Sequence, residues 1–285
     1  MSWYASDLLT DADLLAYEST LDQAFNVDEW ADKRELAMQW VFARLKANGF
    51  DPDKFRTRHA PTLVYSYTGS AYTDRTDAAT SETTDDLNLA TTFATAGTDA
   101  LYVGSTKPFR GLSWRVLEAV SAVSGSVTVA YWGDGWMTLP LDNQINSGGI
   151  PFVKGGSMTW RQPSNWSLRP INSSDPLYWI KVTVSATPTA AKAGQLGCIR
   201  RSALCSVAAL RTLVLLMREA PTGGDGPWRA KADWYEAQLD VELQVALQNV
   251  GGEFDTDDSD QISEDEADQT PEEAGGHGPF KMERA

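Results

Sequence analysis

The order of the predicted elements is the feature that most constrains how this chain folds. Residues 7–49 and about 198–249 show helical patterns, and the long Trp-rich stretch between them reads as β-structure. Neither helical segment is large enough to form a core alone, so we expect the two to pack together around an inserted β-domain. The sequence therefore predicts an α+β protein, in which an α-helical bundle of N- and C-terminal helices carries an inserted antiparallel β-sandwich.

The 285 residues exceed the usual size of one hydrophobic core, which favours two domains and a tail. From the changes in composition we expect helices over 1–52 and 196–250, a linker or exposed excursion over 53–98, a β-sandwich over 99–195 and a disordered tail over 251–285.

Helix signals mark the N-terminal part of the chain. Thr10 and Asp13 have the spacing of a capping box, in which the Thr10 hydroxyl accepts from the backbone amide three residues on. Asn48 and Gly49 supply a left-handed stop for a second helix. Two consecutive amphipathic helices are therefore predicted before residue 50.

Two further helices are predicted near the C-terminus. The segment 204–217 is apolar on more than one face, so it must be covered on several sides. We expect this helix to form the interface with neighbouring subunits, through Leu204, Val207, Leu210, Leu213, Val214 and Leu216. The last helix has an apolar stripe from Trp228 to Ala246, and its opposite face is expected to bear Glu236, Asp240 and Gln244.

The middle of the chain has two characters. Residues 99–187 read as short strands separated by Gly, Pro and Asn turns, which is typical of an antiparallel sandwich or a jelly-roll-like domain. Residues 73–98 are rich in Thr, Asp, Ala and Ser and hold few large apolar residues. We expect 73–98 to be an exposed excursion, or a loop that becomes ordered only on contact with a partner.

The negative charge of the chain is concentrated at its end. Of the net charge of −15, residues 251–285 contribute −10, from twelve acidic residues against Lys281 and Arg284, which leaves −5 for residues 1–250. Such a segment buries too little apolar surface to offset its ordering entropy, so it is predicted to be disordered. Phe280 and Met282 near its far end form an apolar tip that either docks on a partner or is simply part of a solubilising end.

Reactive side chains are scarce. The only histidines are His59 and His277, which excludes His-rich metal sites and makes a Ser-His-Asp triad depend on His59 alone. Cys198 and Cys205 are expected to lie about 10 Å apart on a helix, too far for a disulfide. No cofactor, metal ion or membrane span is predicted, and we expect a protein that is not an enzyme.

The tryptophans of the β-region admit two interpretations. Indole rings fill small cores and subunit contacts, and they also stack on the apolar faces of sugars. Trp132 and Trp179 have the pattern of core residues, whereas Trp166, between Asn165 and Ser167, is predicted to be exposed and is the candidate sugar contact. A protein that binds a carbohydrate or a receptor through this β-region therefore stays open as the alternative function.

The helical frame resembles the head–tail connector (adaptor) family of tailed double-stranded DNA phages. The resemblance rests on the opening residues Tyr4 to Leu9, the paired helices up to Gly49, and the closing helices over 203–218 and 230–247. The segment between the second and third helices departs from the family, because it is far longer than usual.

The resemblance implies a structural subunit of the virion neck, synthesised in the host cytoplasm and lacking enzymatic activity. Members of the family form a homo-oligomeric ring, usually a dodecamer, that docks beneath the portal protein. The ring passes packaged DNA through its lumen without sequence-specific binding and presents a surface to tail or stopper proteins. A mildly acidic body without basic stripes suits such a channel, because it repels phosphates weakly.

Overall fold

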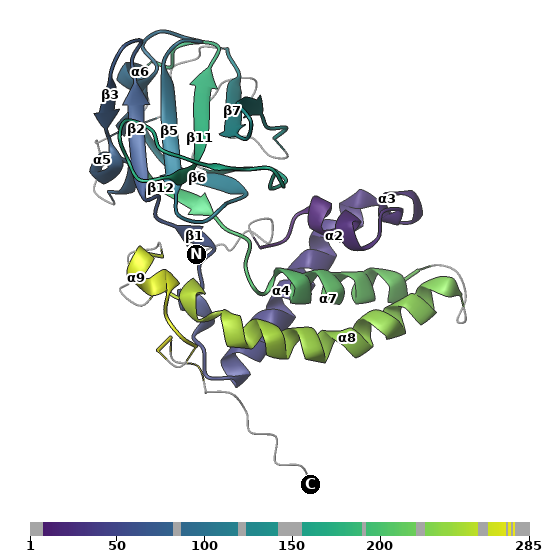
Figure 1. Ribbon diagram of the computed structural model, residues 1–285. Helices are drawn as coiled ribbons and strands as arrows, with labels where there is room; N and C mark the ends of the chain where they lie inside the picture. The colour runs from purple at the N-terminus through teal and green to yellow at the C-terminus, as the bar shows by residue number, and fades with distance from the viewer. Residues whose placement is uncertain are drawn as a thin grey trace. The chain divides into compact units, whose positions relative to one another are not determined.

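The protein has an α+β fold with two antiparallel sheets and several helices (Figure 1). The computed structural model describes residues 8–81, 87–118, 124–141, 156–189, 192–220, 226–255, 262–271, 273–274 and 276. The chain divides into two compact units. The helical unit comprises Met1–Thr57 and Arg201–Ala285, and the β-unit comprises Arg58–Arg200.

The helical unit is built from elements at both ends of the chain. Its helices are Asp11–Tyr17 (α2), Leu21–Ala24 (α3), Val27–Ala47 (α4), Cys205–Arg218 (α7), Pro227–Asn249 (α8) and Glu264–Ala267 (α9), with the 3₁₀ turns Pro52–Lys54 (η1) and Gly251–Glu253 (η2).

Local signals set the ends of these helices. The predicted capping box is confirmed at the start of α2, where Thr10 Oγ1 accepts from the Asp13 amide at 3.3 Å and Asp13 Oδ2 accepts from the Thr10 amide at 2.9 Å. Gly49 has φ +88°, the left-handed conformation expected just after α4. Pro227 opens α8, where its missing N–H costs nothing.

The core of the helical unit forms around α7, which packs against both α4 and α8. Its buried members include Trp30, Val41 and Leu45 of α4 together with Leu239 and Leu243 of α8. Each of the six α7-region residues expected at a subunit interface, from Leu204 to Leu216, is buried within this core at 3% exposure or less. The prediction of an interface at these residues is therefore wrong, since neighbouring helices of the same unit already cover the several apolar faces of α7.

The acidic segment 251–285 is partly structured. Phe254 is buried, stacks on Phe50 with ring centroids 4.8 Å apart, and forms an isolated β-bridge with Phe55. The Glu253 carboxylate accepts from the Ala203 amide at 2.6 Å and from the Ser202 hydroxyl, so it holds the segment against the start of α7. The prediction that the whole segment is disordered is thus wrong, because its first residues are held by the contacts of Phe254 and by the hydrogen bonds of the Glu253 carboxylate. Phe280 and Met282 lie outside the described residues.

The described residues of the β-unit form twelve strands and two short helices. The strands are Arg58–His59 (β1), Leu63–Tyr67 (β2), Tyr72–Asp74 (β3), Leu87–Asn88 (β4), Ala100–Ser105 (β5), Gly111–Glu118 (β6), Val127–Trp132 (β7), Trp136–Thr138 (β8), Gly156–Thr159 (β9), Leu168–Arg169 (β10), Leu177–Val184 (β11) and Lys192–Ile199 (β12). The helices are Thr76–Thr80 (α5) and Leu89–Thr92 (α6).

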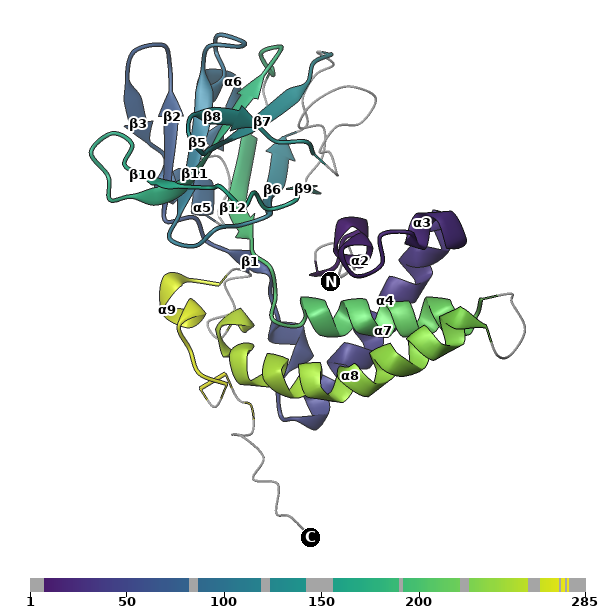
Figure 2. The same cartoon turned by 45° about the vertical axis from the view of Figure 1, so that its right-hand side comes forward.

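The strands form a sheet of five and a sheet of seven, and every pairing is antiparallel. The smaller sheet has the order β1-β12-β6-β9, with β4 also paired to β12. The larger has the order β3-β2-β5-β11-β7-β8, with β10 also paired to β11 (Figures 1 and 2). Buried residues of both sheets, among them Val103 and Ile180 of the larger and Leu112 and Cys198 of the smaller, belong to one hydrophobic cluster.

Residues 58–98 belong to the β-unit and do not form a linker or an exposed excursion. Strand β2 lies inside the larger sheet, and Ala79, Leu87, Leu89 and Phe93 are buried in the β-unit core. The few large apolar residues of this polar segment are thus the ones that face inward. The C-terminal boundary also differs from expectation, because Cys198 lies in β12 and only Cys205 lies in a helix; both cysteines are buried and neither forms a disulfide.

Candidate protein-docking surface

Helix α8 has two apolar faces. One consists of Ala232, Tyr235, Leu239, Leu243 and Ala246, all buried against the rest of the helical unit. These residues recur at three- and four-residue spacings, which keeps them on one side of the helix. This face is the stripe that the sequence predicted.

The second apolar face is exposed. Trp234, Val241 and Val245 are 59%, 61% and 51% exposed. At 100° per residue, positions seven and eleven apart point within about 20° of the same direction, so the three side chains lie in one line along α8. We call these three residues the outer stripe. It lies on the outer side of α8 in addition to the polar residues expected there, Glu236, Asp240 and Gln244.

Polar contacts on both sides of α8 fix its rotation and keep the outer stripe pointing away from the core. Arg218 at the end of α7 pairs with Glu236, and Lys231 pairs with Glu18 at 2.7 Å. The Tyr235 hydroxyl donates to the Tyr17 carbonyl at 3.5 Å. Exposed ion pairs contribute only about 0–1 kcal/mol each, so the buried stripe supplies most of the stability and the pairs select the orientation.

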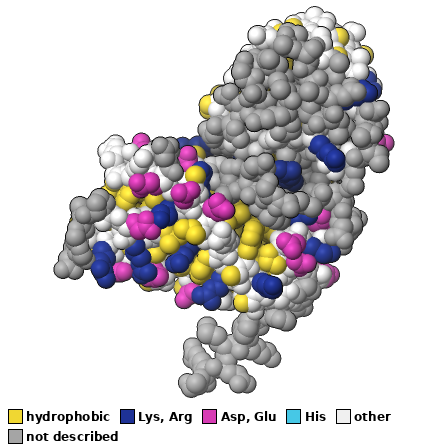
Figure 3. Space-filling view, turned by 180° about the vertical axis from the view of Figure 1, so that it is seen from behind, with side chains coloured by type: hydrophobic (Ala, Val, Ile, Leu, Met, Phe, Trp, Pro, Cys, Tyr) yellow, Lys and Arg dark blue, Asp and Glu magenta, His cyan; other side chains and the backbone are white. Residues whose placement is uncertain are grey.

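The outer stripe has the make-up of a protein interface. An indole at one end of the stripe and two aliphatic side chains lie among charged neighbours, such as Asp233 and Asp240, and interfaces combine an apolar centre with a polar rim in the same way. Tryptophan is also the residue most enriched where binding energy is concentrated. One face of the helical unit in Figure 3 likewise shows hydrophobic side chains exposed among Lys, Arg, Asp and Glu.

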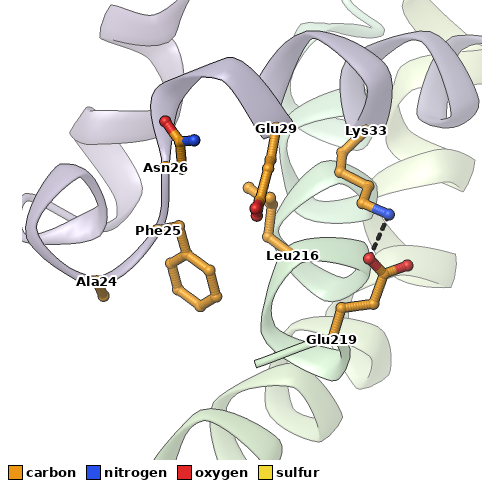
Figure 4. A pocket seen from close by; sticks show the side chains of 7 residues that line it. All are labelled: Ala24, Phe25, Asn26, Glu29, Lys33, Leu216 and Glu219. Atoms are coloured by element: carbon orange, nitrogen blue, oxygen red, sulfur yellow. Dashed lines mark ion pairs between the residues drawn. The ribbon is translucent and has the colours of Figure 1, made fainter. Parts of the chain in front are cut away.

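A pocket of about 300 Å³ lies in the same unit, where the α3–α4 connection meets the end of α7 (Figure 4). Phe25 and Leu216 provide apolar surface inside it, and Glu29 reaches toward Leu216. At its edge Lys33 Nζ and Glu219 Oε2 form an ion pair at 2.5 Å. The full lining is Ala24, Phe25, Asn26, Glu29, Lys33, Leu216 and Glu219.

The chemistry of this pocket favours binding over catalysis. Its lining offers no histidine, cysteine or hydroxyl nucleophile, and it combines two apolar side chains with a charged edge. The Phe25 ring is fixed by an edge contact with Trp228, 5.2 Å between centroids, so the pocket wall is held from α8 as well.

The structure separates the residues that sequence analysis grouped as site candidates. Trp166 is 8% exposed, and its Nε1 donates to the Trp179 carbonyl at 3.2 Å. It also packs against Phe109 at 5.0 Å between ring centroids, so the expectation that Trp166 is exposed is wrong, and its ring is not free to stack on a sugar. Polar neighbours in sequence suggested exposure, but the indole turns into the core between them.

His59 is the one histidine among the described residues, and it is buried in the β-unit. Its Nδ1 lies 3.3 Å from Arg200 Nη1, and Arg200 Nη2 donates to the Ser105 hydroxyl at 3.0 Å. Burial, followed by the charges of Arg200 and Lys107, lowers the pKa of His59 to about 3. The neutral imidazole therefore accepts from Arg200 as part of a structural network.

Across the described part of the chain, no group of three or more His, Cys, Asp or Glu side chains is placed to hold a metal ion. The described helices also include none with the length and apolarity needed to cross a membrane.

Comparison with known proteins adds no relative. The chain matches no known protein family, and no curated protein sequence is significantly similar to it.

Proposed function

We propose that this protein is a structural virion subunit, a head-to-tail connector (adaptor) that forms a homo-oligomeric ring below the portal protein. In this proposal the helical unit builds the ring and the portal contact, and the β-unit is an inserted antiparallel sandwich carried by it. The ring joins capsid to tail at the neck, contacts tail or stopper proteins, and surrounds the DNA channel. The protein is made in the host cytoplasm and has no enzymatic role.

The observation that carries the proposal is the outer stripe of α8. Trp234, Val241 and Val245 leave a line of apolar surface in water on a helix whose other apolar face is already used. A line of large apolar side chains on one helix face is typical of a surface that another protein covers. A ring supplies such a cover for every subunit at once.

The pocket supports the same proposal. In a ring each subunit uses two different surfaces, one toward each neighbour, because the contact is heterologous. The outer stripe and the pocket lined by Phe25, Lys33 and Leu216 are two such distinct surfaces on the helical unit. The net charge of −5 over residues 1–250 suits a channel through which DNA slides without sequence-specific contacts.

Native mass spectrometry of the purified protein, alone and with portal protein, tests the proposal. We expect a closed ring of many copies, usually twelve in the family that the sequence resembles, and cryo-electron microscopy of virions should place it at the neck. A protein that stays monomeric in both samples and is absent from the neck contradicts the proposal.

A further inference from the structure

The outer face of the larger sheet, on the side away from the β-unit core, is aromatic. Tyr65 pairs in register with Tyr102, and Tyr102 pairs with Lys181, so these side chains share one face. Lys181 pairs with Ala130, which puts Trp132, two residues further along β7, on that face as well. The opposite face carries the buried residues Val64, Leu101, Val103, Val129, Ile180 and Val182.

Rings from five strands meet on this face. Tyr67 and Tyr72 lie 4.9 Å apart between centroids, Tyr72 and Tyr102 5.5 Å, and Tyr102 and Trp136 5.4 Å. Trp132 and Trp136 follow at 5.5 Å. We call Tyr67, Tyr72, Tyr102, Trp132 and Trp136 the aromatic face; Tyr102 is 5% exposed and the other four are partly buried. The rings pack on a buried cluster that includes Tyr65, Tyr102 and Trp179, and Tyr67, Tyr72, Trp132 and Trp136 remain partly accessible to solvent.

Arg169 adds a positively charged side chain to the aromatic face. Its guanidinium lies over the Trp132 ring, 3.7 Å from the centroid, in cation–π geometry. Strand β10 is fixed in place because the Trp179 indole donates to the Arg169 carbonyl at 2.7 Å. The guanidinium is therefore positioned by two separate contacts and stays beside the rings.

The charge balance of this face is opposite to that of the chain. Arg169 and Lys181 form no ion pair with any residue that the structure describes. Among the strand positions of this face that the structure describes, the carboxylate is Asp74 at the β3 edge, and it already accepts from the Thr76 amide and hydroxyl at 2.9 and 2.7 Å. Two cationic side chains thus lie on an aromatic surface of a protein whose net charge is −15. This arrangement indicates an anionic ligand.

The mixture of groups favours a saccharide over a protein partner. A pyranose presents a flat apolar face, which packs on aromatic rings, and an edge of hydroxyls, which need hydrogen-bonding groups nearby. Tyr72 provides a partly accessible phenol hydroxyl beside its ring, whereas the Tyr67 hydroxyl already donates to the Gly69 carbonyl at 2.9 Å and can still accept. Arg169 offers the planar fork that binds a carboxylate in bidentate fashion.

We propose that the aromatic face binds a carboxylated saccharide, such as a uronic-acid polymer at a cell surface. In the bound state Trp136 and the tyrosine rings contact the sugar faces, and Arg169 and Lys181 pair with the sugar carboxylates. This activity is independent of ring formation, and it relocates the expected carbohydrate contact from Trp166 to residues that sequence analysis did not group.

Calorimetric titration of the full chain with hexagalacturonate tests the proposal, with the fully methyl-esterified hexamer as the matched uncharged ligand. We expect the acid to bind about tenfold more tightly than the ester and to weaken as salt is raised. Arg169→Gln should reduce the difference between acid and ester, with the remainder due to Lys181, and Trp136→Ala should weaken the binding of both ligands about tenfold. Met137→Ala is the control, since Met137 is the next residue, 43% exposed, and points to the other side of β8.

Two results would overturn the proposal. One is that the protein, shown by circular dichroism to be folded, does not bind the acid. Trp136→Phe is the conservative variant, because it keeps an aromatic ring at this position. The other is polyglutamate competing as well as hexagalacturonate, which would make the face a docking site for acidic protein segments. Either result leaves the proposal of an oligomeric ring intact, because the mass of the oligomer is measured without any saccharide.

Discussion

Helices α7 and α8 are neighbours in sequence and in space, and they hold their apolar residues in opposite ways. Helix α7 is the more apolar, and ten of its fourteen residues are buried inside the helical unit, so it has little apolar surface left to offer. Helix α8 is more polar overall, yet it keeps three large apolar side chains in solvent. A helix with many apolar residues is therefore expected to be buried within its own unit. Apolar residues on a second, separate face of a helix instead predict that another protein covers that face.

Introducing the same charge into both helices should produce the largest contrast. Leu213→Asp places a carboxylate at a fully buried position of α7 and should destabilise the helical unit by about 5 kcal/mol or more, enough to unfold it. Val241→Asp, at a position that is 61% exposed, should change the free energy of unfolding by less than about 0.5 kcal/mol. Urea unfolding followed by circular dichroism measures both, and similar losses in the two variants would refute the contrast.

The acidic segment offers a second contrast between buried and exposed positions. Phe254 is 1% exposed and contacts Phe50 and Phe55, so Phe254→Ala should cost about 3–5 kcal/mol. Thermal unfolding checks this value. A midpoint equal to that of the native chain would restore the prediction that the segment is disordered from residue 251 onward.

Burial also predicts how the stability of the β-unit depends on pH. His59 has a folded pKa of about 3, below its ordinary 6.5, so under pH 6.5 the unfolded state binds a proton that the folded state does not. Stability should therefore fall as pH decreases from 6.5 toward 3, by about 2 kcal/mol at pH 5. The difference in unfolding free energy between the native chain and His59→Gln, measured at pH 7.5 and pH 5, isolates this contribution from that of the carboxylates. An unchanged difference would exclude it.

The smallest effect on stability is expected at the far end of the chain. Deleting residues 279–285 removes Phe280 and Met282 and should change the free energy of unfolding by less than about 0.5 kcal/mol. If the tip docks on a partner, the truncated protein should attach to the portal protein more weakly in pull-downs at every salt concentration. Equal attachment would identify the last residues as a solubilising end.

Local signals in the sequence predicted part of the fold well. The capping box of Thr10 and the left-handed Gly49 depend on neighbours within four residues, and both were found where expected. The strands over 127–132 and 177–184 were similarly visible from alternation.

The errors came from positions where distant parts of the chain decide burial. Trp166 was predicted to be exposed because its neighbours are polar, but the carbonyl of Trp179 binds its indole. Residues 73–98 were interpreted as a loop because their apolar residues are few, although those few complete the β-unit core. The spacing of Trp234, Val241 and Val245 is also visible in the sequence. It gives a weak signal, because the buried stripe of the same helix already accounts for the amphipathic pattern of α8.

The central claim is that the outer stripe of α8 joins this subunit to a neighbour, and a matched pair of variants tests it most directly. Val241→Lys places a charge in the stripe, and Gln244→Lys places the same charge at an exposed position of the same helix outside it. Native mass spectrometry at equal concentration, with portal protein if the native chain requires it, should show rings for the native chain and Gln244→Lys and folded monomers for Val241→Lys. Rings of unchanged mass and stability in Val241→Lys would contradict the claim.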